Sequence, residues 1–247
     1  MAESESESDR IEKQPAIAPW WMVILAMSFP TFVTWFYFYV LADYSDATQK
    51  LGMGFGKSIQ FGLPVFWLIV IRRWKNNWRW PNSDSMWLGF LFGAVTFAVA
   101  VAAWHLWLKN TASMQQAAVE ITNKVAGMGL SSPMSFIALG AFYTVCHSLM
   151  EEYYWRWFVF GMLRQRMAVP MAILVSSLGF MSHHVLVLAK FFGWASIGAW
   201  FFSLCVAVGG AFWAWQYNKT GRLYPAWIGH ALVDAAIFTI GYSMLPA

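Results

Sequence analysis

The chain carries little charge for its length. Of its 247 residues, 11% are Asp, Glu, Lys or Arg, whereas soluble domains average about 25%. Hydrophobic residues make up 59% and aromatic residues 19%. The apolar residues fall into long runs rather than into alternating or one-sided helical patterns. A soluble globular domain cannot bury that much apolar surface, so we expect a protein embedded in lipid.

Cysteine is also scarce. Cys146 and Cys205 both lie in apolar runs and lack metal-ligand spacing, so a disulfide framework and a zinc knuckle are excluded, and both are expected to be small packing residues. The net charge of +4 comes from short basic clusters beside the apolar runs. That pattern fits lipid headgroups better than nucleic acid.

The N-terminal segment differs from the rest of the chain. Residues 1–15 alternate serine with acidic residues and contain almost no apolar side chain, so they cannot offset the entropy of ordering. They also lack the basic start of a signal peptide. We predict a disordered acidic tail over 1–15 and, because no repeat of fixed period follows, a single transmembrane helical domain over 16–247.

Seven apolar segments have about the 20 residues that a helix needs to cross a bilayer. Helices are expected because a backbone exposed to lipid must satisfy its own hydrogen bonds. The predicted fold is therefore all-α, a polytopic bundle with a short interfacial helix around residues 114–125, where Glu120 lies four residues before Lys124. The predicted spans are Trp20 to Ala42, Phe55 to Ile71, Met86 to Leu108, Met134 to Leu163, Ala168 to Phe192, Ala195 to Gln216 and Leu223 to Leu245.

The basic residues predict the topology. Assigning the Lys and Arg residues to the two sides, with those near span ends counted with the adjacent loop, places ten on one side and five on the other and leaves Arg156 within a membrane segment. The N-terminus and residues 72–79 are then cytoplasmic, and the C-terminus lies on the opposite side. The five residues of the minority side are Lys50, Lys57, Lys109, Lys124 and Lys190.

The fourth span contains ionisable residues that are costly in lipid. His147, Glu151, Glu152 and Arg156 share one apolar helix, and each ionisable group at the bilayer centre costs at least ~2.5 kcal/mol on insertion scales. Glu152 and Arg156 are four residues apart and share a face, which predicts an ion pair. Glu151 points about 100° away from Glu152 around the helix axis and lies one turn from His147 on the same face. It is therefore left without a cation.

The fifth and seventh spans add further polar residues. His183 and His184 follow Phe180 in one span, and His230 precedes Asp234 by four residues in the other. Adjacent helical residues point about 100° apart, so only one of the two neighbouring histidines is expected to face Glu151. His105, near the end of the third span, has no charged neighbour and is expected to be structural.

Three runs on three successive polar spans resemble the signature of the CAAX-protease and bacteriocin-processing family, also called CPBP or Abi, which includes the type II CAAX prenyl endopeptidases. The family pattern is Glu-Glu-x-x-x-Arg, Phe-x-x-x-His and His-x-x-x-Asn/Asp. Here it stands as EEYYWR from Glu151, FMSHH from Phe180 and HALVD from His230. The resemblance covers roughly the C-terminal half, with the motifs in 134–247, and implies an intramembrane protease.

The resemblance also implies roles. Glu151 and His184 would hold and deprotonate the attacking water, and Glu152 and Arg156 would brace them. His230 would donate a hydrogen bond to the oxyanion. Asp234 would orient that imidazole, because an ionised aspartate cannot itself donate a hydrogen bond.

The catalytic residues are predicted to share one water-accessible cavity inside the bilayer. His147 is expected to line that cavity and His183 is not. The same side chains could instead hold a divalent metal, because three Glu or His ligands and a water form a catalytic zinc site. The candidate ligands are Glu151, His184 and His230, although no His-Glu-x-x-His motif is present.

Peptide hydrolysis by a Glu/His-activated water is the favoured function, and its partners would be a peptide or protein substrate and membrane lipids. Two alternatives remain. A catalytically silent family member could act as a membrane scaffold or bacteriocin-immunity factor. A proton-coupled transporter would also carry intramembrane Glu, His and Arg, although its expected internal symmetry is absent.

Overall fold

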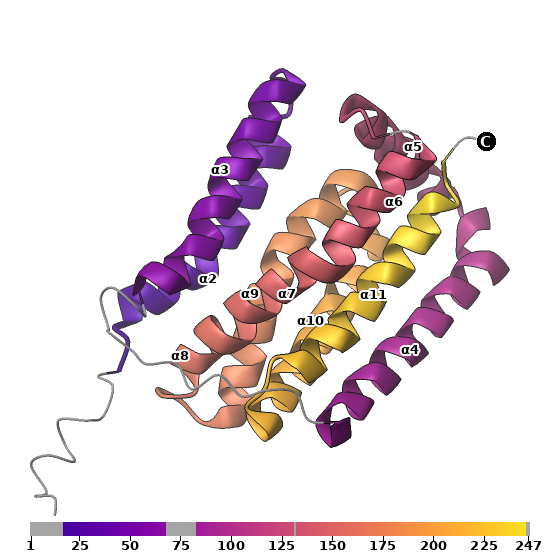
Figure 1. Cartoon of the computed structure of the whole chain (residues 1–247). Coiled ribbons are helices and arrows are strands. Elements are labelled where there is room, and N and C mark those ends of the chain that lie inside the picture. Colours follow the sequence, from indigo (N-terminus) through magenta and orange to yellow (C-terminus); the bar gives the residue numbers. More distant parts are fainter. Residues whose placement is uncertain (1–16, 68–82, 131, 246–247) are drawn as a thin grey trace, which may run out of the picture.

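The structure is a computed structural model that describes residues 17–67, 83–130 and 132–245 (Figure 1). All regular secondary structure in these ranges is helical, so the all-α prediction is confirmed for them. The predicted acidic tail over 1–15 and the basic loop at residues 72–79 lie outside the described residues.

The helices follow one another with short connections. Three of the long helices contain π-helical residues, Phe66 and Trp67 among them, and the turns there are wider than in an α-helix. The elements are α2 (Trp20–Trp35) with a π-helical end (Phe36–Val40), α3 (Asp46–Val65), α4 (Ser83–Leu106), a 3-10 turn (Leu108–Asn110), α5 (Ala112–Gly127), α6 (Pro133–Ala141), a π-helical segment (Phe142–His147), α7 (Ser148–Glu152), a second π-helical segment (Tyr153–Phe160), α8 (Gly161–Leu163), α9 (Val169–Phe192), α10 (Ile197–Thr220) and α11 (Tyr224–Tyr242).

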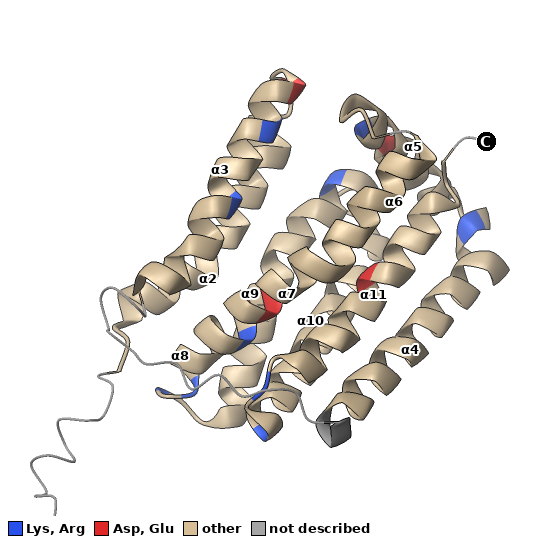
Figure 2. Ribbon diagram, viewed as in Figure 1, with Lys and Arg blue, Asp and Glu red and all other residues tan. Residues whose placement is uncertain are grey.

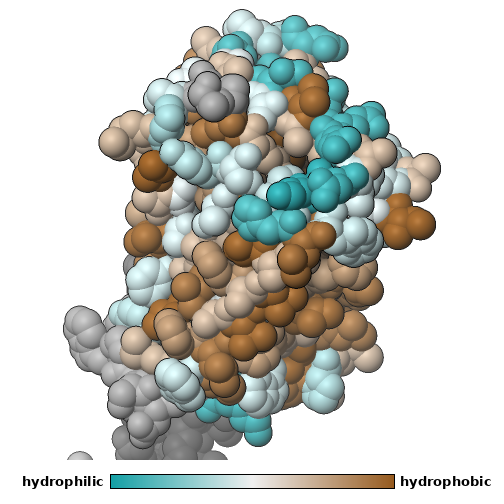
Figure 3. All heavy atoms as spheres, turned by 90° about the vertical axis from the view of Figure 1, so that its right-hand side faces the viewer, coloured by the Kyte–Doolittle hydropathy of each residue, from teal (hydrophilic) through white to brown (hydrophobic). Residues whose placement is uncertain are grey.

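Within the described residues, five helices are long and apolar enough to cross a membrane, which indicates a multi-pass membrane protein. They are Trp20–Val40, Met86–Asn110, Pro133–Leu163, Val169–Phe192 and Ile197–Thr220. The other two predicted spans correspond to α3 and α11, which are not among these five helices. Figure 3 shows the resulting surface, a broad hydrophobic region with hydrophilic residues gathered towards the two ends.

Local sequence explains where several helices begin and end. Ser45, Ser132 and Ser196 each accept a hydrogen bond from a backbone N–H in the first turn of the helix that follows. α10 ends at Gly221, which adopts a left-handed φ of 63° that glycine allows without strain. These caps fix where α3, α6 and α10 begin and where α10 ends.

Small residues bring the central helices close together. α9 packs on α10 through a buried stripe on α10, and α4 packs on α11. A Cβ atom at Gly89 of α4 would lie 1.9 Å from the carbonyl oxygen of Pro225, so the two backbones nearly touch there. The stripe on α10 consists of Ala199, Ser203, Ala207, Gly210 and Ala214.

The hairpin of α2 and α3 packs on the bundle mainly through α2, which lies against α9. Polar side chains fasten this contact inside the apolar region. The Tyr154 hydroxyl donates to the carbonyl of Ala26 at 2.7 Å, and the hydroxyls of Thr31 and Ser182 lie 2.6 Å apart. α3 contacts the helix that contains α7 through Phe61, whose ring centre lies 6.2 Å from that of Tyr154.

The short helix predicted around residues 114–125 is present as α5, with Ala117 and Val125 turned inward, and its position at the membrane interface stays a prediction. The expected contact between Glu120 and Lys124 is replaced by a tertiary one, because the Lys124 ammonium donates to Gln49 Oε1 at 2.5 Å and lies 4.8 Å from the centre of the Tyr37 ring. Burial lowers the pKa of Lys124, and the nearby carboxylate of Asp46 opposes that shift.

Apart from Lys57 and Arg156, the described basic residues lie towards the two ends of the bundle, as Figure 2 shows. Arg164 and Arg166 lie between α8 and α9, and Lys219 and Arg222 lie near the loop between α10 and α11. Arg166 is fixed there by a 2.6 Å hydrogen bond to the carbonyl of Ala18. Since α8 and α10 end and α9 and α11 begin at these loops, the four residues share one end.

Candidate active site

The two glutamates lie on α7, between two π-helical segments of one long helix. π-helical turns alter which backbone carbonyls find partners within the helix, and they occur often at functional sites. Here the carbonyl of Val145 accepts a hydrogen bond at 3.0 Å from the indole of Trp227, which also lies 3.1 Å from Ser148 Oγ. This contact joins α11 to α7 and brings His230, one turn further along α11, towards the glutamates.

Glu152 is held from two sides. Its Oε2 lies 3.0 Å from Arg156 Nε, which confirms the predicted ion pair, and its Oε1 accepts a 2.8 Å hydrogen bond from His230 Nδ1. All three side chains are buried, with exposed fractions of 0% for Glu152, 2% for Arg156 and 4% for His230. Glu152 therefore connects a cation on its own helix to an imidazole on α11.

Aromatic rings surround the guanidinium of Arg156. Its central carbon lies 4.7 Å from the centre of the Phe180 ring and 5.2 Å from that of Trp213. Both distances allow cation–π attraction, which stabilises a cation that has left water. Phe180, the first residue of the second motif, is therefore part of the wall that holds the ion pair.

Glu151 has a different environment, although it is the adjacent residue. Three imidazole nitrogens surround its carboxylate: His183 Nε2 at 3.5 Å, His230 Nε2 at 3.7 Å and His147 Nε2 at 3.9 Å. Among the described residues, no Lys or Arg forms an ion pair with it. Its exposed fraction is only 3%. Glu151 is thus a buried carboxylate that faces imidazoles rather than a fixed cation.

Both histidines of the second motif face this carboxylate. One ligand atom each of Glu151, His183 and His184 lie within 4.8 Å of one another. The expectation that His183 would point away from the site is therefore wrong. The two rings lie next to each other, with centres 4.2 Å apart, so both can face the same carboxylate although adjacent helical residues point about 100° apart.

The two rings are positioned differently. His184 Nδ1 lies 3.0 Å from the carbonyl of Phe180, so its Nε2 remains for the site. The ring of His183 stacks on Trp155, with centres 5.7 Å apart and an angle of 7° between the planes. Neither nitrogen of His183 makes a well-aligned hydrogen bond within the described residues. It is therefore the ring with unused hydrogen-bonding capacity.

His230 is oriented by Glu152 rather than by Asp234. Its Nδ1 bonds Glu152, while its Nε2 lies 3.8 Å from Asp234 Oδ1, beyond hydrogen-bond distance. The ring also stacks on Trp213, with centres 4.3 Å apart. The orienting role that the resemblance implies for Asp234 is thus filled in the structure by Glu152 and an aromatic ring.

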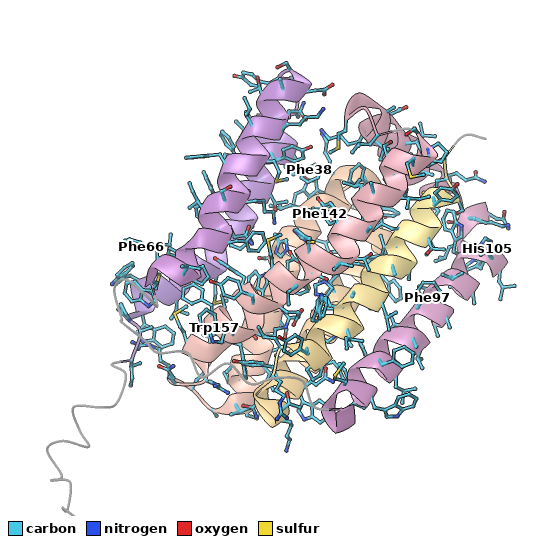
Figure 4. All side chains as sticks on the ribbon, in the orientation of Figure 1. Phe38, Phe66, Phe97, His105, Phe142 and Trp157 are labelled. Atoms are coloured by element: carbon cyan, nitrogen blue, oxygen red, sulfur yellow. The ribbon has the colours of Figure 1, made fainter. Side chains whose placement is uncertain are left out.

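The structure brings together nearly every residue that the sequence singles out. Glu151, His184 and His230 come from three different helices and yet converge in one group. His105 is exposed on α4, apart from this group (Figure 4). The assembled residues are His147, Glu151, Glu152, Arg156, Phe180, His184, His230 and Asp234.

Sequence reasoning missed several participants. The sequence gives no signal for Trp213 and Trp155, because tryptophan is frequent throughout the chain. Lys57 was detectable, since it is a single cation in an apolar segment, but the topology assigns it to a loop. In the structure it lies eleven residues inside α3, and its charge interacts with that of Glu151.

The donor set also fits a divalent metal. Glu151, His183 and His184 could supply one carboxylate and two imidazole ligands, and the unused nitrogens of His183 are what such a site would employ. This set contains His183 in place of the predicted His230, whose Nδ1 is bonded to Glu152.

Comparison with known proteins agrees with the motifs. Residues 133–236 match the family model described as type II CAAX prenyl endopeptidase Rce1-like. This region is an Rce1-like domain of that family. The match begins at the first residue of α6 and ends two residues after Asp234, so it includes all three motifs. No curated protein and no solved structure matches the chain significantly.

The Rce1-like family is one of CAAX proteases, and the buried cluster of Glu151, His183 and His184 is consistent with a catalytic site. α2, α3, α4 and α5 lie outside the matched region.

Proposed function

We propose that the chain is an intramembrane endopeptidase in which Glu151 activates the water that attacks a peptide bond. The observation that carries this proposal is the environment of Glu151: a buried carboxylate without a paired cation, facing three imidazoles, inside a domain of a protease family. A structural carboxylate at this depth would be expected to resemble Glu152, which is fully engaged.

The first chemical step is removal of a proton from water. A carboxylate within hydrogen-bond reach of a bound water acts as a general base and takes that proton as the oxygen attacks the carbonyl carbon. His183 and His184 flank the same carboxylate and have nitrogens that can orient the water. No serine or cysteine nucleophile is required, and the proton on Glu151 is available for the departing amine.

His230 is suited to stabilise the oxyanion. A donated hydrogen bond from Nδ1 to Glu152 fixes one proton on the ring, and Nε2 then faces Glu151 and Asp234. A neutral imidazole would offer only a lone pair at Nε2, so the proposed donor is the imidazolium form. A donor fixed before the reaction stabilises the developing charge without reorganisation.

A metal-dependent form of the same reaction uses the same donor set. Glu151, His183 and His184 would hold a divalent cation such as zinc, which would supply Lewis-acid activation of a bound water. In that form His230 and Glu152 keep their positions, because neither belongs to the ligand set. We favour the metal-free form, since Glu151 already provides a base beside the histidines.

We also propose seven membrane crossings, with α3 and α11 added to the five apolar helices, and a cytoplasmic N-terminus. Gln60 of α3 and His230 of α11 are buried inside the bundle, as polar residues within a membrane normally are. Reporter fusions placed after Gln14 and after Ala247 test it, and identical sidedness would contradict it.

Mass spectrometry of cleaved peptides tests the function itself. The full chain would be purified in lipid vesicles and offered farnesylated peptides that end in Cys, two aliphatic residues and a variable residue, together with an unmodified peptide library. We expect new peptide termini with the wild-type chain and none with the Glu151→Gln variant. Equal products from both proteins would refute the assignment of Glu151, and no products from either would favour a silent scaffold.

A further inference from the structure

Lys57 is a cation at the active site that the family match does not include. It lies on α3, roughly 16 Å along the helix axis from the first residue, Asp46. That distance exceeds the reach of a lysine side chain, so its ammonium cannot extend to the headgroups at that end. It shares the inward face of α3 with the buried residues Gln60 and Pro64, at spacings of three and seven.

The contacts of Lys57 direct it to the site. Its ammonium lies 5.4 Å from the centre of the Phe61 ring, and that ring meets His147 edge-on at 6.0 Å. His147 in turn is one of the imidazoles beside Glu151. The charge of Lys57 interacts with those of Glu151, His147 and His183. The lysine therefore faces the cluster from the hairpin side.

Lys57 nevertheless has no counter-ion there. Within the described residues, no carboxylate forms an ion pair with its ammonium. Glu152 is engaged by Arg156 and His230, and Glu151 is surrounded by imidazoles. An ammonium largely removed from water and lacking an anion favours binding of an anionic group from outside the chain.

The group it would bind is a carboxylate. Every peptide carries one at its C-terminus, and acidic side chains supply others. A phosphate would favour several cations or the planar fork of arginine, whereas one lysine offers a single positive charge. We propose that Lys57 is a specificity-determining residue that binds a carboxylate of the peptide substrate on the hairpin side of Glu151. This inference rests on the proposed function.

The test uses three farnesylated peptides with the same scissile bond. One ends in Cys-Val-Ile-Ser with a free carboxylate, one has the same sequence with a C-terminal amide, and the third is an amide in which Glu replaces the final Ser. kcat/KM would be measured for the wild type, Lys57→Met and Lys57→Arg. Lys50→Met is the matched control, because Lys50 lies on the same helix but donates to the carbonyl of Met128 at 3.2 Å.

We expect Lys57→Met to lower kcat/KM for the free-carboxylate peptide by on the order of 10-fold, mainly through KM, as for loss of a charge-assisted hydrogen bond. The plain amide should be unaffected, Lys57→Arg should recover most of the loss, and Lys50→Met should behave as the wild type. A loss confined to the Glu-containing amide would identify a side-chain carboxylate as the ligand. Equal losses on all three peptides, or no loss, would overturn the proposal.

A binding measurement separates this outcome from failure of the proposed function. Fluorescence anisotropy of the three labelled peptides would be recorded with the wild-type and Lys57→Met chains, whether or not hydrolysis occurs. Tighter binding of a carboxylate peptide by the wild type alone supports the role of Lys57. Equal affinities for the three peptides would overturn it even if hydrolysis by Glu151 were established.

Discussion

The two faces of α7 show how one short helix can hold two carboxylates for different purposes. On one face, Glu152 is bound by Arg156 and by His230 Nδ1, and two aromatic rings enclose the guanidinium. On the other face, Glu151 meets only imidazoles at 3.5 to 3.9 Å. The difference shows that burial alone does not define a reactive group. What distinguishes Glu151 is that its neighbours are imidazoles, which can exchange protons.

Of the substitutions that test the contrast between Glu151 and Glu152, replacement of Arg156 should have the largest effect. Replacing it by alanine leaves Glu152 buried and deprived of its cation, which we expect to cost about 3–5 kcal/mol of folding free energy. The double variant Glu152→Gln/Arg156→Ala should cost less than the single change, because the unpaired carboxylate has been removed. Thermal melts in detergent would measure both.

Arg164→Ala provides the control for that experiment. Arg164 is exposed and lies 5.6 Å from the centre of the Tyr217 ring, so its loss should change the folding free energy by only about 0.5 kcal/mol. Simple additivity of the Glu152 and Arg156 changes would contradict the coupling of the pair.

The second prediction concerns the residue that contacts both faces. His230→Asn removes the imidazole whose Nδ1 bonds Glu152 and whose Nε2 faces Glu151. Loss of a single oxyanion donor typically lowers kcat by about 10²–10³-fold, and we expect a decrease of that size. His105→Asn, an exposed histidine on α4, is the matched control and should leave kcat unchanged. A His230→Asn enzyme with normal kcat would remove this residue from the chemistry.

The third prediction concerns whether the Glu151 site holds a metal. If the site works without metal, chelators should change the rate by less than about twofold, and purified active protein should contain no stoichiometric metal. His183→Asn would then slow hydrolysis without changing metal content. Elemental analysis that finds one tightly held metal per active chain, lost in His183→Asn, would assign Glu151, His183 and His184 as ligands instead.

The motifs and periodicity were sufficient to predict the all-helical fold and most of the site. Helical spacing alone gives the contact between Glu152 and Arg156, because the two residues lie on one helix. The contact between Glu152 and His230 joins residues 78 positions apart and depends on how α11 crosses α7. The helical repeat of about 3.6 residues carries no information about how two helices cross. A contact of this kind requires the tertiary structure.

His183 and Lys57 show two further limits. Adjacent residues on a helix do point about 100° apart, but this angle does not say where the carboxylate of Glu151 lies relative to His183 and His184. Lys57 was assigned to a loop because the topology rule counts charges near span ends, and the start of α3 at Asp46 was not evident in a segment with so many polar residues. In both cases the missing information was the position of a second helix.

The most direct test of the division between the two glutamates is a paired measurement on Glu151→Gln and Glu152→Gln in the same vesicle preparation. Single-turnover cleavage rates and melting temperatures would be recorded for both variants and the wild type. We predict that Glu151→Gln loses about 10²–10⁴-fold in rate while melting close to the wild type, as for removal of a general base. Glu152→Gln should melt lower and retain a rate at least about tenfold above that of Glu151→Gln. A Glu151→Gln chain that cleaves at the wild-type rate, or a Glu152→Gln chain that is the slower of the two, would contradict the account.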